Sequence, residues 1–368
     1  MTQPRQGTTE RVFFDATDLI EFLQRQESVS GVQRVVAETV PLLLEHQSGT
    51  SKHAVILDRH RGEFVELTDH ETETSVRQGA RASSAITDKV QLAASATAVI
   101  TRAHAAPVVH MNRGDVLVFL GALWINDALM LAARDAHANG VKLVDLLYDL
   151  TPVMQTGHTA GVNKLFDRYL TLIAQTATRI PAISESSRHD FELWCQNSNM
   201  NNQLVPAGAA TGLPCGLTPE QFPANESPSP WPREYVLFVG TIESRKNHIL
   251  AFNVWKKLIN ERGAENIPDL VCIGRLGWHA NEFLKEYTFT KGLGGKIAIL
   301  TGSVSDSELA SFYSHAAFTF YPSNYEGWGL PVSESIAFGK VPIEQISSVC
   351  VFCLELWQND EDDQKQKD

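Results

Sequence analysis

Two glutamates, Glu326 and Glu334, lie eight positions apart in the stretch SNYEGWGLPVSESIAFG, residues 323–339. Gly327 and Gly329 stand between them, and glycines let a backbone approach a ligand closely and point its N–H groups at it. A carboxylate early in a helix can accept two hydrogen bonds from a vicinal diol such as a ribose, and one in the preceding loop can hold sugar hydroxyls. The pair could instead satisfy the unpaired N–H groups at a helix start.

Two adjacent cations, Arg245 and Lys246, follow a short apolar run that ends at Gly240. The run YVLFVG (235–240) predicts a buried strand, and a helix is expected soon after the cations. Cations at the carboxyl end of a strand, near a helix N-terminus, can bind an anion: arginine forks onto phosphate oxygens and lysine adds a point charge. The alternative is a solvated surface pair.

A glycosidase also uses two carboxylates for catalysis, and they lie on either side of the glycosidic bond that it cleaves. The spacing of Glu326 and Glu334 is compatible with that reading. However, a hydrolase needs no cations to hold a diphosphate, so Arg245 and Lys246 would have no role in it. The two pairs together therefore favour a phosphate-bearing sugar ligand.

The bulk composition is that of a globular protein. The chain has 368 residues, 43% of them hydrophobic and 20% charged, with a formal net charge of −12. This length predicts two domains, each able to bury a core. The negative charge argues against a nucleic-acid partner and against generic binding to an anionic membrane.

Targeting and cysteine signals point to a cytoplasmic protein, with a place at the inner face of the membrane left open. Residues 1–20 show no apolar segment followed by a cleavage site, so we expect no signal peptide. The apolar run at 116–125 is about half the length that spans a bilayer and predicts a buried strand entering a loop. Five cysteines are expected as reduced thiols, and the lone Cys350-x-x-Cys353 predicts neither a metal nor a redox site.

A proline-rich segment marks the expected domain boundary. Six prolines between Leu213 and Glu234 are incompatible with a helix or a central strand. The predicted organisation is a first domain at 1–212, a linker at 213–234, a second domain at 235–343 and an atypical tail at 344–368.

The second half alternates strands and helices, which predicts a parallel sheet covered on both faces. The expected elements are a strand at 235–240, a helix with an apolar stripe at Leu250, Val254 and Leu258, strands at 270–274 and 297–300, a helix opened by a capping box at Ser305 and Glu308, a strand at 318–321, and a helix from Pro331 to Gly339.

The first half repeats this alternation less regularly. Two α/β domains joined by a linker are expected to have a cleft between them. In such sheets ligands bind at the carboxyl ends of the strands. The expected elements are a strand and turn at 11–19, a helix after Ser30-Gly31, strands at 115–121 and 141–150 with a helix at 127–138 between them, a strand leading into a helix at 179–187, and a partly helical, surface-lying segment at 60–110.

These motifs resemble those of the family-4-type, or group 1, glycosyltransferases, which have the GT-B fold of two Rossmann-like domains facing a cleft. YEGWGLPVSES carries the E-x7-E signature, GTIESRKN (240–247) resembles G-T-x-x-x-R-K-N, and the segment 302–323 fits the region between. In the first half, the stretches that resemble one bacterial subgroup are DATDL (15–19), SGVQRV (30–35), LYDLTPV (147–153) and AISESSRHD (182–190).

The resemblance implies a retaining, metal-independent sugar transfer from a nucleoside diphosphate sugar, without a cofactor. Arg245 and Lys246 would neutralise the diphosphate and stabilise charge on the leaving group. Glu334 would bind the ribose, and Glu326 would contact the hydroxyls of the donor sugar. The other donor-binding positions would be Gly31, Gly240, Gly327, Gly329 and Leu330.

The resemblance also places Asp149 near the acceptor, as a further catalytic candidate. The family often has His-Asp where this chain has Tyr148-Asp149, which leaves an acid/base or backbone-anchoring role at position 148 open. Asp18 is a second candidate on the acceptor side.

The carboxyl-terminal end departs from the family pattern. Family members usually continue with another strand-helix unit and a last helix that crosses back onto the first domain. This chain follows the pattern to about Ile343, and residues 359–368 are nearly all charged or amide, which predicts disorder. We expect a truncation or reading-frame change near residue 344 that destabilises the second domain and weakens or removes catalysis.

Three functions remain open at this level. The first is transfer of a hexose, with GDP-mannose as the favoured donor, to a polysaccharide or lipid-linked glycan acceptor. The second is a non-catalytic remnant that binds a nucleotide or a partner. The third is a GT-B relative that epimerises or hydrolyses a nucleotide sugar.

Overall fold

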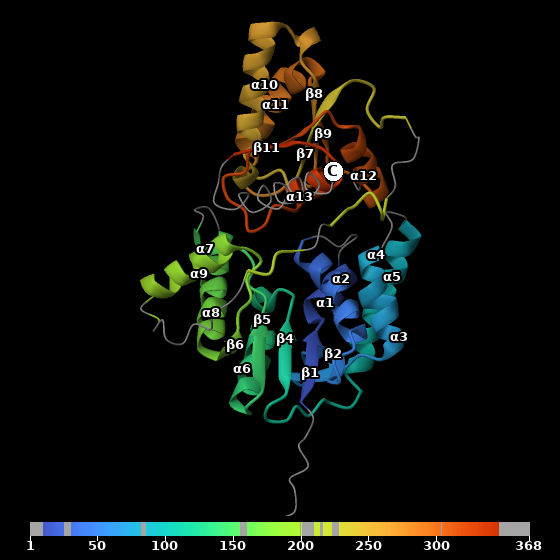
Figure 1. The fold of residues 1–368 in the computed structure, drawn as a ribbon, viewed down its shortest axis with the longest axis vertical. Helices are drawn as coiled ribbons and strands as arrows, with labels where there is room; N and C mark the ends of the chain where they lie inside the picture. The colour runs from blue at the N-terminus through green and yellow to red at the C-terminus, as the bar shows by residue number, and fades with distance from the viewer. Residues whose placement is uncertain are drawn as a thin grey trace, which may run out of the picture. The chain divides into compact units, whose positions relative to one another are not determined.

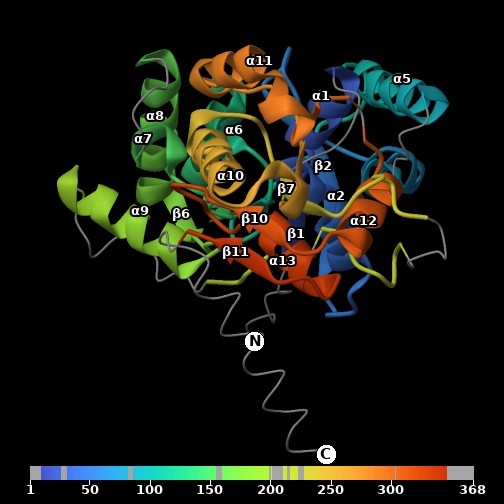
Figure 2. The ribbon, with the colours of Figure 1, turned by 90° about the horizontal axis from the view of Figure 1, so that it is seen from above.

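The computed structural model describes residues 10–25, 31–81, 86–154, 160–198, 200, 210–213, 216–222, 228–302 and 304–345. The chain divides into two compact units, Met1–Gly212 and Leu213–Asp368, and each is described by itself (Figures 1 and 2). The segment 213–234, predicted as a linker, is counted with the second unit. The predicted tail beyond residue 345, Cys350 and Cys353 included, lies outside the described residues, as do Ser30, Pro214 and Pro223.

The first unit is built on a six-stranded sheet with the order β3-β2-β1-β4-β5-β6. All neighbouring strands are parallel except the edge pair of β2 and β3. The strands are β1 (Arg11–Asp15), β2 (Ser51–Asp58), β3 (Glu63–Glu66), β4 (Val116–Phe119), β5 (Lys142–Asp145) and β6 (Ala177–Arg179).

Helices of the first unit pack on this sheet and close its core. Buried side chains from β1, β4 and β5 meet residues of α6, α8 and α9 there, among them Phe13, Leu117, Leu129 and Tyr169. The helices are α1 (Thr17–Arg25), α2 (Val32–Glu45), α3 (Asp69–Glu71), α4 (Gln78–Arg81), α5 (Ile86–Ala103), α6 (Asp127–Ala138), α7 (Thr151–Met154), α8 (Ala160–Thr176) and α9 (Glu185–Asn197), with a π-helical turn η1 (Thr72–Arg77) and a 3₁₀ turn η2 (Leu123–Ile125).

Three expectations for the first unit need correction. The segment predicted as a strand and turn at 11–19 already begins helix α1 at Thr17. Strands β2 and β3 were not predicted, and their short connection after Asp58 can join only antiparallel neighbours, so the sheet is not wholly parallel. The segment 60–110 is not merely surface-lying, because α5 packs against α1 and buries Ala96 and Val99.

The second unit is built on a five-stranded parallel sheet with the order β11-β10-β7-β8-β9. All its strands pair in parallel, as the alternating pattern predicts. The strands are β7 (Tyr235–Val239), β8 (Asp269–Ile273), β9 (Ile297–Leu300), β10 (Thr319–Tyr321) and β11 (Pro342–Glu344).

Helices of the second unit begin near Ser305 and Pro331, as the sequence predicts, whereas the helix at Asn281–Gly295 was not predicted. The capping box is confirmed: the Ser305 hydroxyl accepts a hydrogen bond from the Glu308 N–H at 3.1 Å, and the Glu308 carboxylate accepts one from the Ser305 N–H at 2.8 Å. The helices are α10 (His248–Arg262), α11 (Asn281–Gly295), α12 (Asp306–His315) and α13 (Leu330–Ala337), with 3₁₀ turns η4 (Ser244–Lys246) and η5 (Ala264–Asn266).

The buried face of α10 differs from the predicted stripe. Leu250 is 38% exposed, and Val254 and Leu258 are only partly buried. A stripe with the same helical spacing, rotated on the helix, is buried instead because it carries the larger aromatic rings. Its members are His248, Ala251, Phe252 and Trp255.

The predicted fold class, α/β with two parallel-sheet units, is confirmed. The apolar run at 116–125 forms strand β4 and then the turn η2, not a longer apolar helix. Within the described part of the chain, no helix combines the length and the hydropathy needed to cross a membrane.

Candidate functional site

The sheet of the second unit brings the two predicted motifs to one edge. Arg245 and Lys246 lie in η4, directly after β7, and Glu326 lies in the loop after β10. Strands β7 and β10 are parallel neighbours, so their carboxyl ends meet at the same side of the sheet. Residues 80 positions apart in the sequence thereby come into contact.

Glu326 is the centre of a buried ion-pair network. Its Oε1 lies 2.6 Å from Lys246 Nζ, and its Oε2 lies 2.9 Å from Arg245 Nη1. The Ser323 hydroxyl also donates a hydrogen bond to Oε1. Glu326 is only 6% exposed and Lys246 only 8%. The reading of Arg245 and Lys246 as a solvated surface pair is therefore wrong.

Arg245 is held from several directions. Its Nη2 lies 2.8 Å from a carboxylate oxygen of Glu243, and its Nη1 donates to the Tyr325 carbonyl at 2.9 Å. The Arg245 carbonyl in turn accepts a hydrogen bond from the Asn324 N–H at 2.8 Å. The loops after β7 and β10 are thus joined by side-chain and main-chain bonds, which fix the guanidinium in place.

Lys246 fills a narrow space at the end of β7. Its ammonium donates to the Tyr321 hydroxyl at 2.6 Å as well as to Glu326. Its stem runs past Gly240, where an added Cβ would lie 3.6 Å from the lysine Cδ. Gly274 closes the other side, since a Cβ there would come within 1.9 Å of the Gly240 carbonyl oxygen. Glycine at position 274 is therefore a packing requirement, whereas a Cβ at Gly240 would make an ordinary contact with the lysine.

The electrostatics of the network keep its carboxylate ionised. Burial alone would raise the pKa of Glu326, but the charges of Lys246 and Arg245 outweigh burial and bring that pKa below the usual glutamate value. Burial lowers the pKa of Lys246, and Glu326 opposes this shift. The neighbouring His248 has a pKa of about 3, because it is buried and lies near Lys246. It is therefore neutral at physiological pH.

Glu334 is placed by the helix that the opening motif predicts. Helix α13 begins at Leu330, after Gly329 at φ 85°, a left-handed conformation that favours glycine. Glu334 is buried within this helix, and its Oε2 accepts a hydrogen bond of 2.8 Å from the Tyr313 hydroxyl. Gly327, in the loop before the helix, is also buried. The carboxylate is thus oriented by a tyrosine.

Asp149 lies in the loop between β5 and α7 of the first unit. It is half-buried, and its Oδ1 accepts a hydrogen bond from the Thr151 N–H at 3.1 Å. Its neighbour Tyr148 is buried and donates its hydroxyl proton to the Leu120 carbonyl at 2.7 Å. The residue at position 148 therefore anchors the backbone, one of the two roles that the sequence left open.

The other candidates in the first unit lie at the starts of its first two helices. Gly31 precedes α2 with φ 55°. Asp18, near the start of α1, is buried and accepts hydrogen bonds from the Gln33 amide at 2.9 Å and the Ala122 N–H at 3.0 Å. Burial raises the pKa of Asp18. The roles expected for these two residues remain predictions.

Sequence reasoning missed the residues that orient the predicted ones. Two of them stand close in sequence to their partners: Glu243 is two residues before Arg245, and Ser323 is three before Glu326. Tyr313 and Tyr321 come from α12 and β10, and no local pattern links them to the glutamate and lysine that they bind. Among the described residues, no group of three or more His, Cys, Asp or Glu side chains could hold a metal ion.

Comparisons of sequence identify the same region. Residues 221–349 match the family model of the group 1 glycosyl transferases. The serotype-specific mannosyltransferase WbdA of Escherichia coli is 24% identical over 223 residues, which are 56% of this chain and 26% of WbdA. The O-antigen chain mannosyltransferase B of Escherichia coli is 34% identical over 109 residues, 30% of this chain and 27% of that protein. The chain thus spans about a quarter of the length of these relatives.

Solved structures resemble the whole chain. An α,α-trehalose-phosphate synthase from Burkholderia vietnamiensis aligns with a TM-score of 0.52 at 10% identity, over 92% of this chain and 84% of that one. Anabaena HepE, solved with UDP and glucose, aligns with a TM-score of 0.50 at 13% identity, over 92% and 81%. At such identities the likeness shows the fold alone. Residues 221–349 are thus similar to the group 1 glycosyl transferases, in a chain that has the GT-B fold.

Proposed function

We propose that this protein transfers a hexose from a nucleoside diphosphate sugar to a polysaccharide or lipid-linked glycan acceptor, with retained configuration and without a metal. The observation that carries the proposal is the buried network of Arg245, Lys246 and Glu326 at the carboxyl edge of the second sheet. GDP-mannose is the favoured donor, and the similarity to two mannosyltransferases supports mannose as the sugar.

The network supplies fixed positive charge for a leaving diphosphate. When the bond between the sugar carbon and the phosphate oxygen breaks, negative charge grows on the diphosphate, and pre-positioned cations stabilise it without rearrangement. Arg245 and Lys246 are held by Glu243 and Glu326, so their positions are set before a ligand arrives. Two side-chain cations in this place supply what a bound metal ion would otherwise provide.

Glu326 has a second task in this proposal. Both of its oxygens already bind the two cations, so it orients them in addition to contacting hydroxyls of the donor sugar. Glu334, oriented by Tyr313, binds the ribose diol. The backbone at Gly240, Gly327, Gly329 and Leu330 completes the donor contacts.

A thermal-shift titration with GDP, UDP, dTDP and ADP tests the donor site. At a hundred times its Kd, a nucleotide that binds only the folded state raises Tm by about 5–10 °C for a unit of this size. Glu334→Ala should abolish the shift. The matched control is Glu282→Ala, an exposed carboxylate on α11 of the same unit, which should leave the shift unchanged. If no nucleotide shifts a cooperatively melting protein, the donor site is absent.

Turnover then separates the three functions. Transfer of mannose from GDP-mannose to a glycan acceptor in the presence of EDTA, with an α product seen by NMR, supports the proposal in full. Nucleotide binding without transfer identifies a non-catalytic binder. Release of free sugar without an acceptor identifies a hydrolase.

A further inference from the structure

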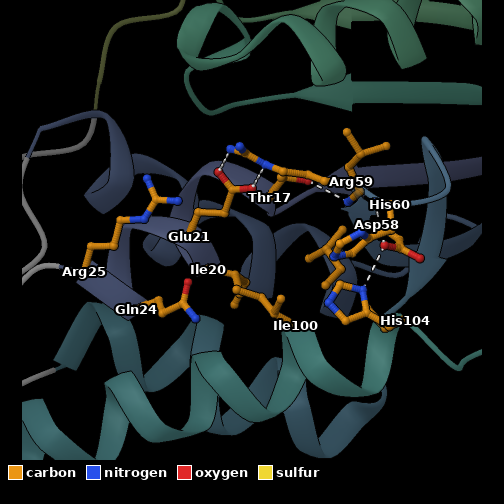
Figure 3. Close-up of a pocket in the computed structure, with 13 residues that line it drawn as sticks. Thr17, Ile20, Glu21, Gln24, Arg25, Asp58, Arg59, His60, Ile100 and His104 are labelled. Carbon is orange, nitrogen blue, oxygen red and sulfur yellow. Dashed lines mark hydrogen bonds and ion pairs between the residues drawn. The ribbon is translucent and has the colours of Figure 1, made fainter.

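A pocket of about 150 Å³ lies within the first unit, apart from every residue assigned above to donor or acceptor (Figure 3). It is formed by one side of helix α1, the end of strand β2 and the last turn of helix α5. These three elements pack on one another, so the pocket is part of the fold of the unit.

The floor of the pocket is apolar. In Figure 3, Ile20 from α1 and Ile100 from α5 lie side by side in its middle, between two groups of polar side chains. Such a floor favours a ligand with an apolar portion, because covering it removes hydrocarbon from water. The apolar lining residues are Ile20, Ile56, Leu57, Ile100 and Ala103.

Both carboxylates of the pocket are already engaged by cations of the protein. The two oxygens of Glu21 accept hydrogen bonds from the Arg59 guanidinium. Asp58, fully buried, forms an ion pair with Arg61 and accepts a hydrogen bond from His104 Nδ1 at 3.0 Å. Burial would raise the pKa of Asp58, but these donors lower it, so the carboxylate is ionised and paired.

Arg25 is a further cation of the pocket, and neither of the two carboxylates pairs with it. It is the last residue of α1, it lines the pocket, and it has no hydrogen-bond or ion-pair partner among the described residues. Figure 3 shows it at one end of the pocket, next to Gln24, with His60 and His104 at the other end. Counting Arg61 behind Asp58, three guanidinium groups face two carboxylates. This local excess of positive charge stands in a chain of net charge −12.

We propose that this pocket binds a small amphiphilic anion, with a phosphate or carboxylate group on Arg25 and a short alkyl chain over Ile20 and Ile100. A guanidinium can bind either anion through two parallel hydrogen bonds. The Gln24 amide, whose bond to the Thr97 hydroxyl is long at 3.4 Å, is a further polar group that lines the pocket. The ligand thus pairs the unused charge and covers the exposed floor.

Calorimetric titration of the full chain with a homologous series tests both parts of the proposal. The probes are inorganic phosphate, methyl, ethyl and butyl phosphate, butyrate, and the uncharged butanol. Affinity should rise roughly fourfold for each methylene that the floor buries. Butanol should not bind measurably. Tighter binding of butyl phosphate than of butyrate assigns a phosphate ester as the natural head group, and the reverse order assigns a carboxylate.

Two variants assign the binding to this pocket. Arg25→Gln should weaken butyl phosphate about tenfold, as expected for the loss of a charge-assisted hydrogen bond. Ile100→Ala should leave inorganic phosphate unchanged and flatten the dependence on chain length. Arg134→Gln, a change of another exposed arginine in the same unit, is the matched control and should have no effect.

The proposal is overturned if no probe binds, if Arg25→Gln binds butyl phosphate as well as the unchanged protein does, or if affinity does not depend on alkyl length. The test uses no nucleotide and no sugar. Its result therefore stands apart from that of the donor-site experiments.

Discussion

The two units bury carboxylates in similar places and treat their charge differently. In the first unit, Asp15 and Asp145 are the last residues of parallel strands β1 and β5, and each is only 2% exposed. Asp15 accepts a hydrogen bond from the Thr17 hydroxyl, and Asp145 accepts one from the Tyr169 hydroxyl at 2.6 Å. Neither has a cation partner among the described residues, and burial raises the pKa of each to about 7.

Glu326 of the second unit is almost as deeply buried, but its pKa moves in the opposite direction. Lys246 and Arg245 stand against its two oxygens and bring the pKa below the usual value despite burial. Burial alone therefore does not set the protonation state of a carboxyl group. The partner of the carboxyl group sets it. A buried carboxyl group with only a hydroxyl donor titrates near neutrality, whereas one that contacts cations stays ionised.

The difference matters for function because the network of Arg245, Lys246 and Glu326 keeps fixed charge at its sheet edge ready for an anionic ligand. At the ends of β1 and β5, the same kind of position holds acids that can be neutral at physiological pH. Perturbed acids of this kind are frequent in functional sites, but they also occur as structural hydrogen-bonding groups. Four experiments test this contrast.

Lys246→Met should have the largest effect. It leaves a buried carboxylate with Arg245 as its single remaining cation, and we expect the second unit to lose about 3 kcal/mol of stability. Urea unfolding followed by hydrogen exchange of peptides from β7 and β10 measures the loss. Adding Glu326→Gln should restore part of it, because the uncompensated charge disappears. If the double variant loses the sum of the two single losses, the ion pair does not account for the network.

The pH dependence should have opposite signs in the two units. Because the folded pKa values of Asp15 and Asp145 lie near 7, above the unfolded value of 3.8, the folded first unit binds more protons between these limits and loses stability as pH rises through this window. We expect about 2 kcal/mol per group between pH 5 and pH 7. The contribution of Glu326 is present above pH 4.5 and is lost as pH falls through its lowered folded pKa.

Hydrogen exchange at pH 5 and pH 7, measured separately for peptides of each unit, determines how the stability of that unit depends on pH. Relative to the intrinsic amide exchange rate at each pH, peptides of β4 and β5 should open through global unfolding more readily at pH 7. Peptides of β7 and β8 should open less readily at pH 7, because the pKa of buried His248 is about 3 and the unfolded chain takes up its proton below 6.5. Equal slopes in both units would remove the contrast.

Asp145→Asn should sharpen the comparison with a smaller effect. The amide keeps an oxygen for the Tyr169 hydroxyl and cannot ionise. Between pH 5 and pH 8 the variant should gain about 2–3 kcal/mol of stability relative to the parent, because only the parent can ionise at this position. Glu326→Gln is the paired variant and should be destabilising at both pH values. A loss of stability in Asp145→Asn at pH 8 would show that the aspartate is held as an ion.

Ser323→Ala should have the smallest effect. It removes one hydrogen bond to Glu326, worth about 1 kcal/mol, and so raises the pKa of that carboxyl group. The acid unfolding midpoint of the second unit should move to higher pH. Ser333→Ala, which removes a hydroxyl that donates to the Leu330 carbonyl, is the control and should leave this midpoint in place. An unchanged midpoint for Ser323→Ala would mean that the cations alone hold Glu326.

Local features of the fold were predictable because their causes are local. The capping box at Ser305, the helix at 127–138 and the glycine before α13 depend on residues within one helical turn. Strands β2 and β3 escaped prediction because the polar, Ala/Thr-rich stretch that follows them hides the boundary. The buried face of α10 was predicted wrongly because several apolar spacings compete on one helix, and packing selects among them.

The ends of the strands could be predicted from the sequence, because strand-helix alternation places Arg245, Lys246 and Glu326 in loops after parallel strands. The resemblance to the group 1 glycosyltransferases was also visible there. The buried ion pair of Lys246 and Glu326, and the hydroxyl partners of Asp15 and Asp145, could be found only in the folded chain. The physical reason is that a pKa depends on the charges and the solvent around a group, and the folded chain brings these together from distant positions.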